Sequence, residues 1–150
     1  MNCDIEAVLE LFEDREAYLR KLKKQTYESN TEACEGKYGT YMDNLIESVD
    51  KSDDRTATAD SLALELASAV KDKYSKRGRI KSALLMDLNF MMIYYFFPYL
   101  LKIAGEHADT ASLIAETVKK RWNEILGCNI SYAPYEEIAA GFKKKLFGYF

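Results

Sequence analysis

Apolar residues recur at intervals of three and four along most of this chain, which is the spacing of a helix with one buried face. The first such stripe lies in 4–27 and is interrupted by Glu16. Similar stripes predict further helices over 31–50, 54–77 and 110–126, and one that begins at Pro134. The expected caps are side-chain oxygens at the helix starts and glycines at the ends. They are Asp4, the turn 51–54 and Asp109 at the starts, and Gly78, Gly105 and Gly127 at the ends.

One segment departs from the single stripe. The run 90–101, FMMIYYFFPYLL, holds six of the nineteen aromatic residues and is apolar on every side of a helix. A helix that is hydrophobic all round is surrounded by other elements. Isoleucine, tyrosine and phenylalanine also favour a strand over 90–97, but the flanks 82–88 and 100–104 have helical character with no turn between them. We therefore predict an all-α, single-domain bundle of five or six helices around a central, kinked hydrophobic helix over about 79–104.

Pro98 is the reason to expect the kink. It has no N–H to bond the carbonyl of Tyr94, and its ring presses against the preceding turn. A kink near Tyr94–Pro98 follows. It either curves the helix around the core or opens a cavity there.

The same run raises the question of a membrane span. The nineteen residues 83–101 have the right length. Their nine Leu, Ile or Phe side chains supply only about −3 to −5 kcal/mol for insertion. Asp87 alone costs about 2.5–3.5 kcal/mol at the helix centre, and Asn89, Pro98 and three tyrosines add to this. We predict no transmembrane span.

Composition supports an ordinary intracellular domain. The 150 residues are 48% hydrophobic and 30% charged, which suits one globular domain over 1–150. Cys3, Cys34 and Cys128 are odd in number and show no CxxC spacing, so reduced thiols and a cytoplasmic location are expected. The acidic first residues do not resemble a signal peptide.

Charge is unevenly distributed. Residues 1–60 carry a net charge of −7 and residues 61–150 a net charge of +4, although the whole chain carries only −3. Six bases flank one acid over 71–81. The candidate anion-binding residues there are Lys76, Arg77, Arg79 and Lys81. We expect the helix over 110–126 to return antiparallel and to bring Lys119, Lys120 and Arg121 to the same end, beside the free N–H groups of a helix start. The alternative is a solvated end that offsets the acidic half.

Two polar residues lie inside the apolar segment, Asp87 and Asn89. A buried carboxylate needs a partner, and the antiparallel return predicts that Asp87 pairs with Arg121. A ligand pocket beside Pro98 would use these side chains together with the nearby tyrosines. Its candidate residues are Asp87, Asn89, Tyr94, Tyr95, Tyr99 and Arg121.

Catalytic and metal-binding signatures are lacking. His107 is the only histidine and lies in a short connection, where we expect it to be solvated. The sequence contains no HExxH, ExxH, GxxxxGK[ST] or GxGxxG pattern, so no metal or cofactor is predicted. Lysines 143–145 lie among aromatic residues, in either a closing helix or a membrane-surface anchor.

These features favour a small, soluble, non-enzymatic protein that acts through contacts with a protein partner or with itself. The first alternative is a small-molecule-binding bundle with the aromatic pocket near Pro98. The second is phosphate or nucleic-acid binding at 71–81, although the net charge of −3 disfavours nucleic acid.

Overall fold

The computed structural model describes residues 4–22 and 38–130 and shows an all-α bundle, as the hydrophobic pattern predicts. In these two ranges the backbone forms helices and connections, and the one β-type pairing is an isolated bridge between Lys76 and Arg79. The helices are α1 (Ile5–Glu13), α2 (Arg15–Leu22), α4 (Gly39–Asp50), α5 (Arg55–Tyr74), α6 (Ser82–Met91), α7 (Phe97–Ile103) and α8 (Ala108–Leu126). A π-helical turn (Met92–Phe96) joins α6 to α7, and a 3₁₀ turn (Gly105–His107) precedes α8. The first part of the expected helix over 31–50, residues 31–37, and the expected helix from Pro134 lie outside the described residues.

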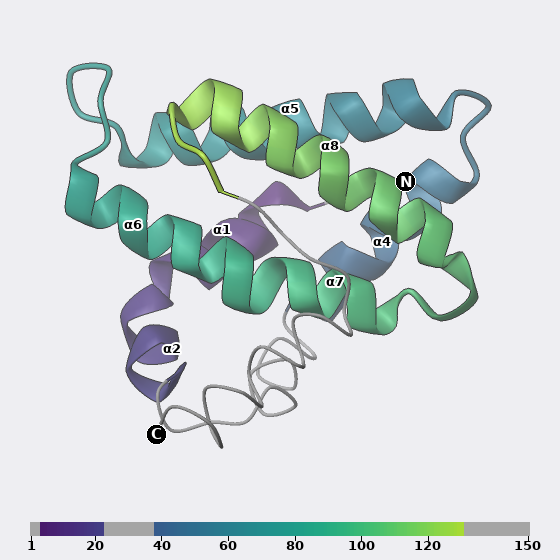
Figure 1. The fold of residues 1–150 in the computed structure, drawn as a ribbon, viewed down its shortest axis with the longest axis horizontal. Coiled ribbons are helices and arrows are strands. Elements are labelled where there is room, and N and C mark those ends of the chain that lie inside the picture. The colour runs from purple at the N-terminus through teal and green to yellow at the C-terminus, as the bar shows by residue number, and fades with distance from the viewer. Residues whose placement is uncertain (1–3, 23–37, 131–150) are drawn as a thin grey trace.

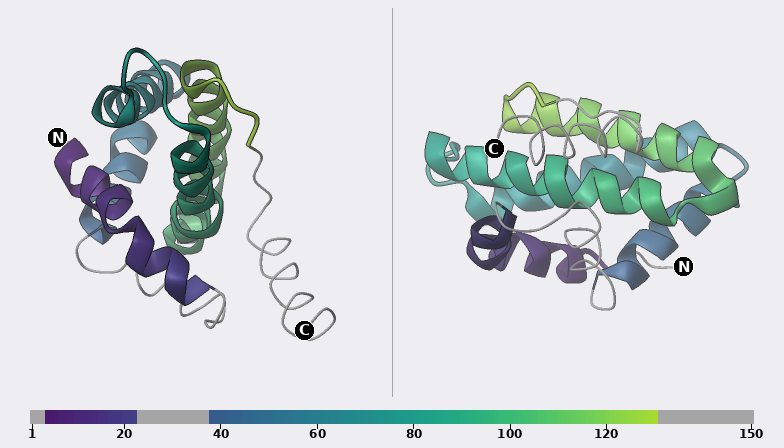
Figure 2. Two further views of the ribbon diagram at one scale, coloured as in Figure 1. Left: turned by 90° about the vertical axis from the view of Figure 1, so that its left-hand side faces the viewer. Right: turned by 60° about the horizontal axis from the view of Figure 1, so that its bottom comes forward.

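The first expected helix is divided in two at Asp14. Asp4 caps α1 as predicted, with its side chain accepting from the N–H of Glu6 at 3.1 Å. The division falls where charged residues interrupt the apolar stripe. It lets the two pieces take different directions: α1 contacts α4 and α5, whereas α2 contacts α6. Figure 2 shows α1 and α2 on one side of the α6–α7 segment and α8 on the other.

The long helices form one layered arrangement. In Figure 1, α5 and α8 run in the same direction, and α6–α7 returns the opposite way. Asp54 caps α5 by accepting from the N–H of Ala57, as the turn 51–54 predicts. Gly127 ends α8 in the left-handed conformation, also as predicted. The expectation that Asp109 caps α8 is wrong: the cap position is His107, without a side-chain cap bond, and Asp109 lies in the first turn.

The hydrophobic helix is buried over its second half. The side chains from Met91 to Leu100 are buried, apart from the partly exposed Ile93 and Tyr94. The first half has two faces, because Leu88 is fully buried while Met86 and Phe90 are 55% and 37% exposed. The prediction that this helix is enclosed on every side therefore fails for α6, and the strand alternative over 90–97 is wrong.

The helix accommodates Pro98 through a π-helical turn that precedes it. The N–H of Phe97 bonds to the carbonyl of Met92, five residues back, and Pro98 follows in the first turn of α7. A widened turn makes room for the proline ring, which would press on the preceding carbonyl in an uninterrupted α-helix. The backbone thus adapts to Pro98 within one helix, and no break separates α6 from α7 in Figure 1.

One helix among the described residues, Ser82–Ile103, is long and apolar enough to cross a membrane by length and composition. Its most apolar window has a mean hydropathy of 1.4, and half of that window is buried within the bundle. The core helix of a soluble bundle has the same properties.

Candidate functional site

The segment between α5 and α6 is a tight hairpin, where the sequence predicted helix as far as residue 77. Its backbone closes through two reciprocal bonds, from the N–H of Lys76 to the carbonyl of Arg79 at 2.7 Å and from the N–H of Arg79 to the carbonyl of Lys76 at 3.2 Å. Arg77 and Gly78 both have positive φ, 54° and 77°. Two central residues with positive φ define a type I′ turn, which favours glycine and asparagine. Gly78 therefore has the predicted positive φ, but in a turn and not at a helix end.

We call Lys76, Arg77, Arg79 and Lys81 the hairpin cations. All four side chains are exposed, and the hairpin projects from the end of the bundle where α5 finishes and α6 begins (Figure 1). Within the parts of the chain that the structure describes, none of the four makes an ion pair or a side-chain hydrogen bond. A closed turn holds these like charges close together, and no carboxylate of the described residues pairs with them, so the region has a local positive potential.

Other bases nearby are used within the fold. Lys73, in the last turn of α5, forms an ion pair with Glu13, and this contact raises the pKa of the Lys73 ammonium. Arg121 forms a two-pronged pair with Asp60, with Nε–Oδ1 and Nη2–Oδ2 distances of 2.7 and 2.6 Å. Lys119 pairs with Glu116 at 3.1 Å. The expectation that Lys119, Lys120 and Arg121 come to the same end as the hairpin is therefore wrong for Arg121 and Lys120, which lie beside Asp60 near the start of α5.

The predicted Asp87–Arg121 pair does not form. Arg121 lies against Asp60 and Glu124, and Asp87 is only partly buried on α6. The antiparallel return of α8 along α6 is correct, but the next residue along faces α6: the indole Nε1 of Trp122 donates to Oδ1 of Asn89 at 2.8 Å. One residue on a helix corresponds to about 100° of rotation, which sends Arg121 to α5 and Trp122 to α6. Asn89 is thus the hydrogen-bond acceptor for the buried indole of Trp122.

The tyrosines proposed for a ligand pocket face different elements. The Tyr95 hydroxyl donates to the backbone carbonyl of Tyr18 at 2.7 Å. Tyr99 lies against α4, where a Cβ atom added to Gly39 would come within 2.9 Å of its hydroxyl oxygen. Tyr94 is partly exposed and its ring lies 6.0 Å from that of Phe90. These three side chains therefore support the packing of α2, α4 and α6, and they do not converge as one set of pocket hydroxyls.

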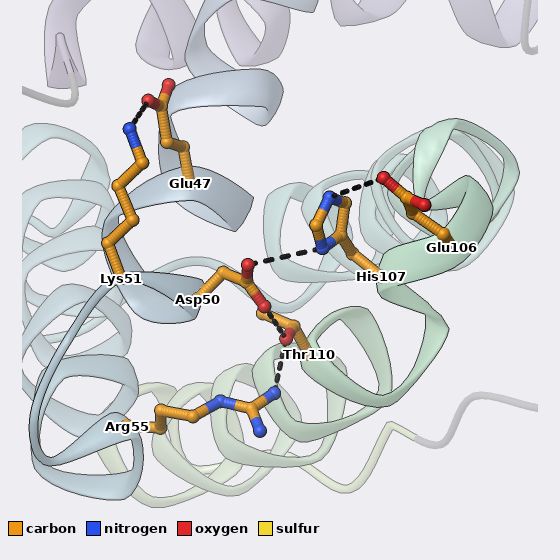
Figure 3. A network of polar contacts seen from close by, with 7 residues as sticks. All are labelled: Glu47, Asp50, Lys51, Arg55, Glu106, His107 and Thr110. Atoms are coloured by element: carbon orange, nitrogen blue, oxygen red, sulfur yellow. Dashed lines mark hydrogen bonds and ion pairs between the residues drawn. The ribbon is translucent and has the colours of Figure 1, made fainter.

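A polar network that the sequence did not indicate joins α4, α5 and α8 (Figure 3). Asp50, at the end of α4, accepts from the hydroxyl of Thr110 at 2.8 Å and lies 3.2 Å from Nδ1 of His107. Arg55 donates to the same buried Thr110 hydroxyl. The Thr110 bond, helped by His107 and Arg55, holds the pKa of Asp50 below its usual range. His107 lies in the connecting turn with its side chain 43% exposed, as expected, and it also contacts Asp50 of α4.

The chemistry available to this network is limited. A shallow groove beside it is lined by Asp43, Ile46, Glu47, Asp50, Lys51, Ile103 and His107. His107 and Asp50 resemble a general base and the carboxylate that orients it. However, the described residues that line this groove include no hydroxyl or thiol nucleophile. The nearby Thr110 hydroxyl is already bonded to Arg55 and Asp50. Over 4–22 and 38–130 the side chains form no cluster suited to a metal ion.

The remaining sequence predictions concern the cysteines and the C-terminus. Cys128 has a free thiol whose pKa is raised by burial. Cys3, Cys34 and lysines 143–145 lie outside the described residues. No family model, curated protein or solved structure matches this chain, so the candidate site rests on its own geometry.

Proposed function

We propose that this chain is a non-enzymatic binding protein whose contact element is the 76–81 hairpin and whose partner carries negative charge. The observation that carries the proposal is the contrast in charge pairing. The hairpin cations have no acidic partner among the described residues, whereas Lys73, Lys119 and Arg121 are each held by a carboxylate.

The backbone of the hairpin adds to this argument. A type I′ turn closed by two bonds presents its side chains from a fixed frame, so less conformational freedom is lost on binding than from a loose loop. Arg77 also has a positive φ, a backbone conformation that is unfavourable for arginine. An arginine in an unfavourable backbone conformation favours a role for its guanidinium outside the fold.

Binding is favoured over catalysis because the potential catalytic groups already have structural partners. His107 and Asp50 hold α4 to the start of α8, and Asn89 holds Trp122. The hairpin itself, 76–81, offers exposed cations and no carboxylate, imidazole, hydroxyl or thiol. Such a surface recognises charge and does not transform a substrate.

Retention on immobilised heparin as a function of salt tests the proposal. A protein of net charge −3 has no general reason to be retained, so elution at a measurable salt concentration reports a local basic surface. The hairpin variant, Arg77→Asn with Arg79→Gln, should elute much earlier. Asparagine suits the first central position of a type I′ turn, so this variant keeps the backbone frame.

A matched control separates local from overall charge. Arg20→Gln with Lys51→Gln removes the same number of positive charges from exposed positions on α2 and after α4. It should leave the elution salt nearly unchanged. Equal losses in both variants, or no retention of the parent protein at low salt, would refute the proposed function.

A further inference from the structure

We infer that the anionic partner of the hairpin is a membrane surface rich in anionic lipids, which α6 contacts with an exposed apolar face beside the hairpin cations. This inference rests on the proposed function and adds the class of partner. It rests on two observations. The cations of 76–81 have no acidic partner in the described part of the chain, and Met86 and Phe90 are exposed on the helix that follows directly.

The apolar face is defined by helical spacing. Ala83, Met86 and Phe90 stand at i, i+3 and i+7 of α6, and all three are exposed. At 1.5 Å per residue, Met86 lies about 7–8 Å and Phe90 about 13–14 Å along the helix axis from Lys81. The exposed apolar side chains therefore begin within about 8 Å of the last hairpin cation along the axis of α6.

Other positions of α6 are held by the bundle. Leu88 and Met91 are fully buried, and Asn89 is bonded to Trp122. The orientation of α6 is thereby set, so the outward direction of Met86 and Phe90 follows from the packing.

A lipid surface fits both the cations and the apolar side chains. Bases lie at the level of anionic headgroups, and phenylalanine and methionine side chains enter the boundary between headgroups and acyl chains. Each base near an anionic leaflet raises partitioning about fivefold. Nucleic acid would use the bases and could stack on Phe90, but it offers no comparable site for Met86, the more exposed of the two side chains.

Surface contact agrees better with the packing than a membrane span does. Crossing the bilayer with Ser82–Ile103 would remove the buried side chains of Tyr95, Phe96 and Phe97 from the bundle. Contact through one face of α6 leaves that core intact.

Asp87 supplies an internal check. It is partly buried on α6 beside the exposed face, and it is the one carboxylate of that helix. An anionic surface repels it, so Asp87→Asn should strengthen vesicle binding about twofold to fivefold.

Vesicle flotation at about 0.1 M salt, near physiological screening, tests the inference with the full chain. The probes are phosphatidylcholine vesicles and vesicles in which part of the phosphatidylcholine is replaced by phosphatidylserine. The protein should float with the mixed vesicles and remain behind with phosphatidylcholine alone. The hairpin variant and Met86→Ser with Phe90→Ser should each reduce binding to mixed vesicles at least tenfold.

Leu64→Ser is the matched control for the apolar face, because Leu64 is 39% exposed on α5. It should float like the parent protein, as should Arg20→Gln with Lys51→Gln. Circular dichroism of every variant confirms that the helices are retained.

The heparin measurement distinguishes the two levels of the argument. Hairpin-dependent retention on heparin without flotation overturns the lipid inference and leaves the proposed function standing. Absence of both hairpin-dependent heparin retention and flotation refutes the proposed function and the lipid inference together. Binding of a short RNA that requires Met86 and Phe90, in the absence of flotation, also overturns the inference. So does vesicle association that resists alkaline carbonate, which would indicate a span.

Discussion

The indole N–H of Trp122 is bonded to the side-chain oxygen of Asn89, and this 2.8 Å contact fixes how α8 lies along α6. Both groups are removed from bulk water, since Trp122 is fully buried and Asn89 is partly so. A single polar contact therefore specifies a rotation that the surrounding apolar residues would leave less defined.

Asn89→Leu should destabilise the protein by about 1–3 kcal/mol, because the buried indole N–H loses its acceptor. Urea unfolding measures the change. In a Trp122→Phe background, which has no N–H to satisfy, the same substitution should cost clearly less. Additive effects of the two substitutions would contradict the assignment.

Gly39→Ala should destabilise the protein although alanine is the better helix former. The added Cβ would lie 2.9 Å from the hydroxyl oxygen of Tyr99, whose ring is only 5% exposed and has little room to move. Overpacking of this kind costs about 1–3 kcal/mol. Tyr99→Phe removes the crowded atom, so Gly39→Ala should be nearly neutral or stabilising in that background. A persistent cost there would place the strain elsewhere.

For the glycine of the hairpin turn, backbone conformation and not crowding determines the expected cost of substitution. Nothing lies within 4 Å of a Cβ added to Gly78, so any cost of Gly78→Ala comes from its φ of 77° alone. We expect a loss of about 1 kcal/mol. Arg77→Asn should instead gain a few tenths of a kcal/mol, since asparagine tolerates positive φ. Thermal unfolding of the two single variants checks both signs, and equal effects would argue against a type I′ turn.

Acid should weaken the fold through Asp50 and Asp60. Hydrogen bonds from Thr110 and from Arg121 hold the pKa of these two carboxyls below the ordinary aspartate value. A carboxyl whose pKa is lower when folded contributes stability that is complete above its unfolded pKa of about 4 and disappears as the pH falls through the folded value. The free energy of unfolding should therefore decrease below about pH 4.

Carboxyl carbon NMR titration identifies the cause at Asp50. Thr110→Val removes the hydroxyl donor with little change in shape, so the pKa of Asp50 should rise toward the ordinary value. Asp60 is the internal control, because Arg121 and not Thr110 holds it. An unchanged Asp50 titration would show that His107 or Arg55 dominates.

The helices could largely be predicted from the chain, because a stripe of apolar residues needs only local spacing to be recognised. The hairpin could not. Lysine and arginine are good helix formers, so 75–77 resembles a continuation of α5, and the Arg-Gly pair is a weak turn signal compared with Asn-Gly.

The side-chain partners were harder still to predict. The choice between Arg121 and Trp122 as the neighbour of α6 depends on about 100° of helix rotation, which periodicity does not resolve. The contact between Asp50 and His107 joins residues far apart in the chain, and neither position carries a local signal for it. The four hairpin cations were identified correctly as a cluster, since clustering along the chain survives any local backbone conformation.

The π turn over Met92–Phe96 is equivalent to one extra residue inserted into a continuous α-helix. Removing one residue there would restore regular α-helical bonding and rotate α6 by about 100° relative to α7. Asn89 would leave Trp122, and the outward side of α6 would become a different set of residues. The π turn that follows α6 therefore sets the rotation of this helix about its axis. That rotation decides whether Met86 and Phe90 face solvent.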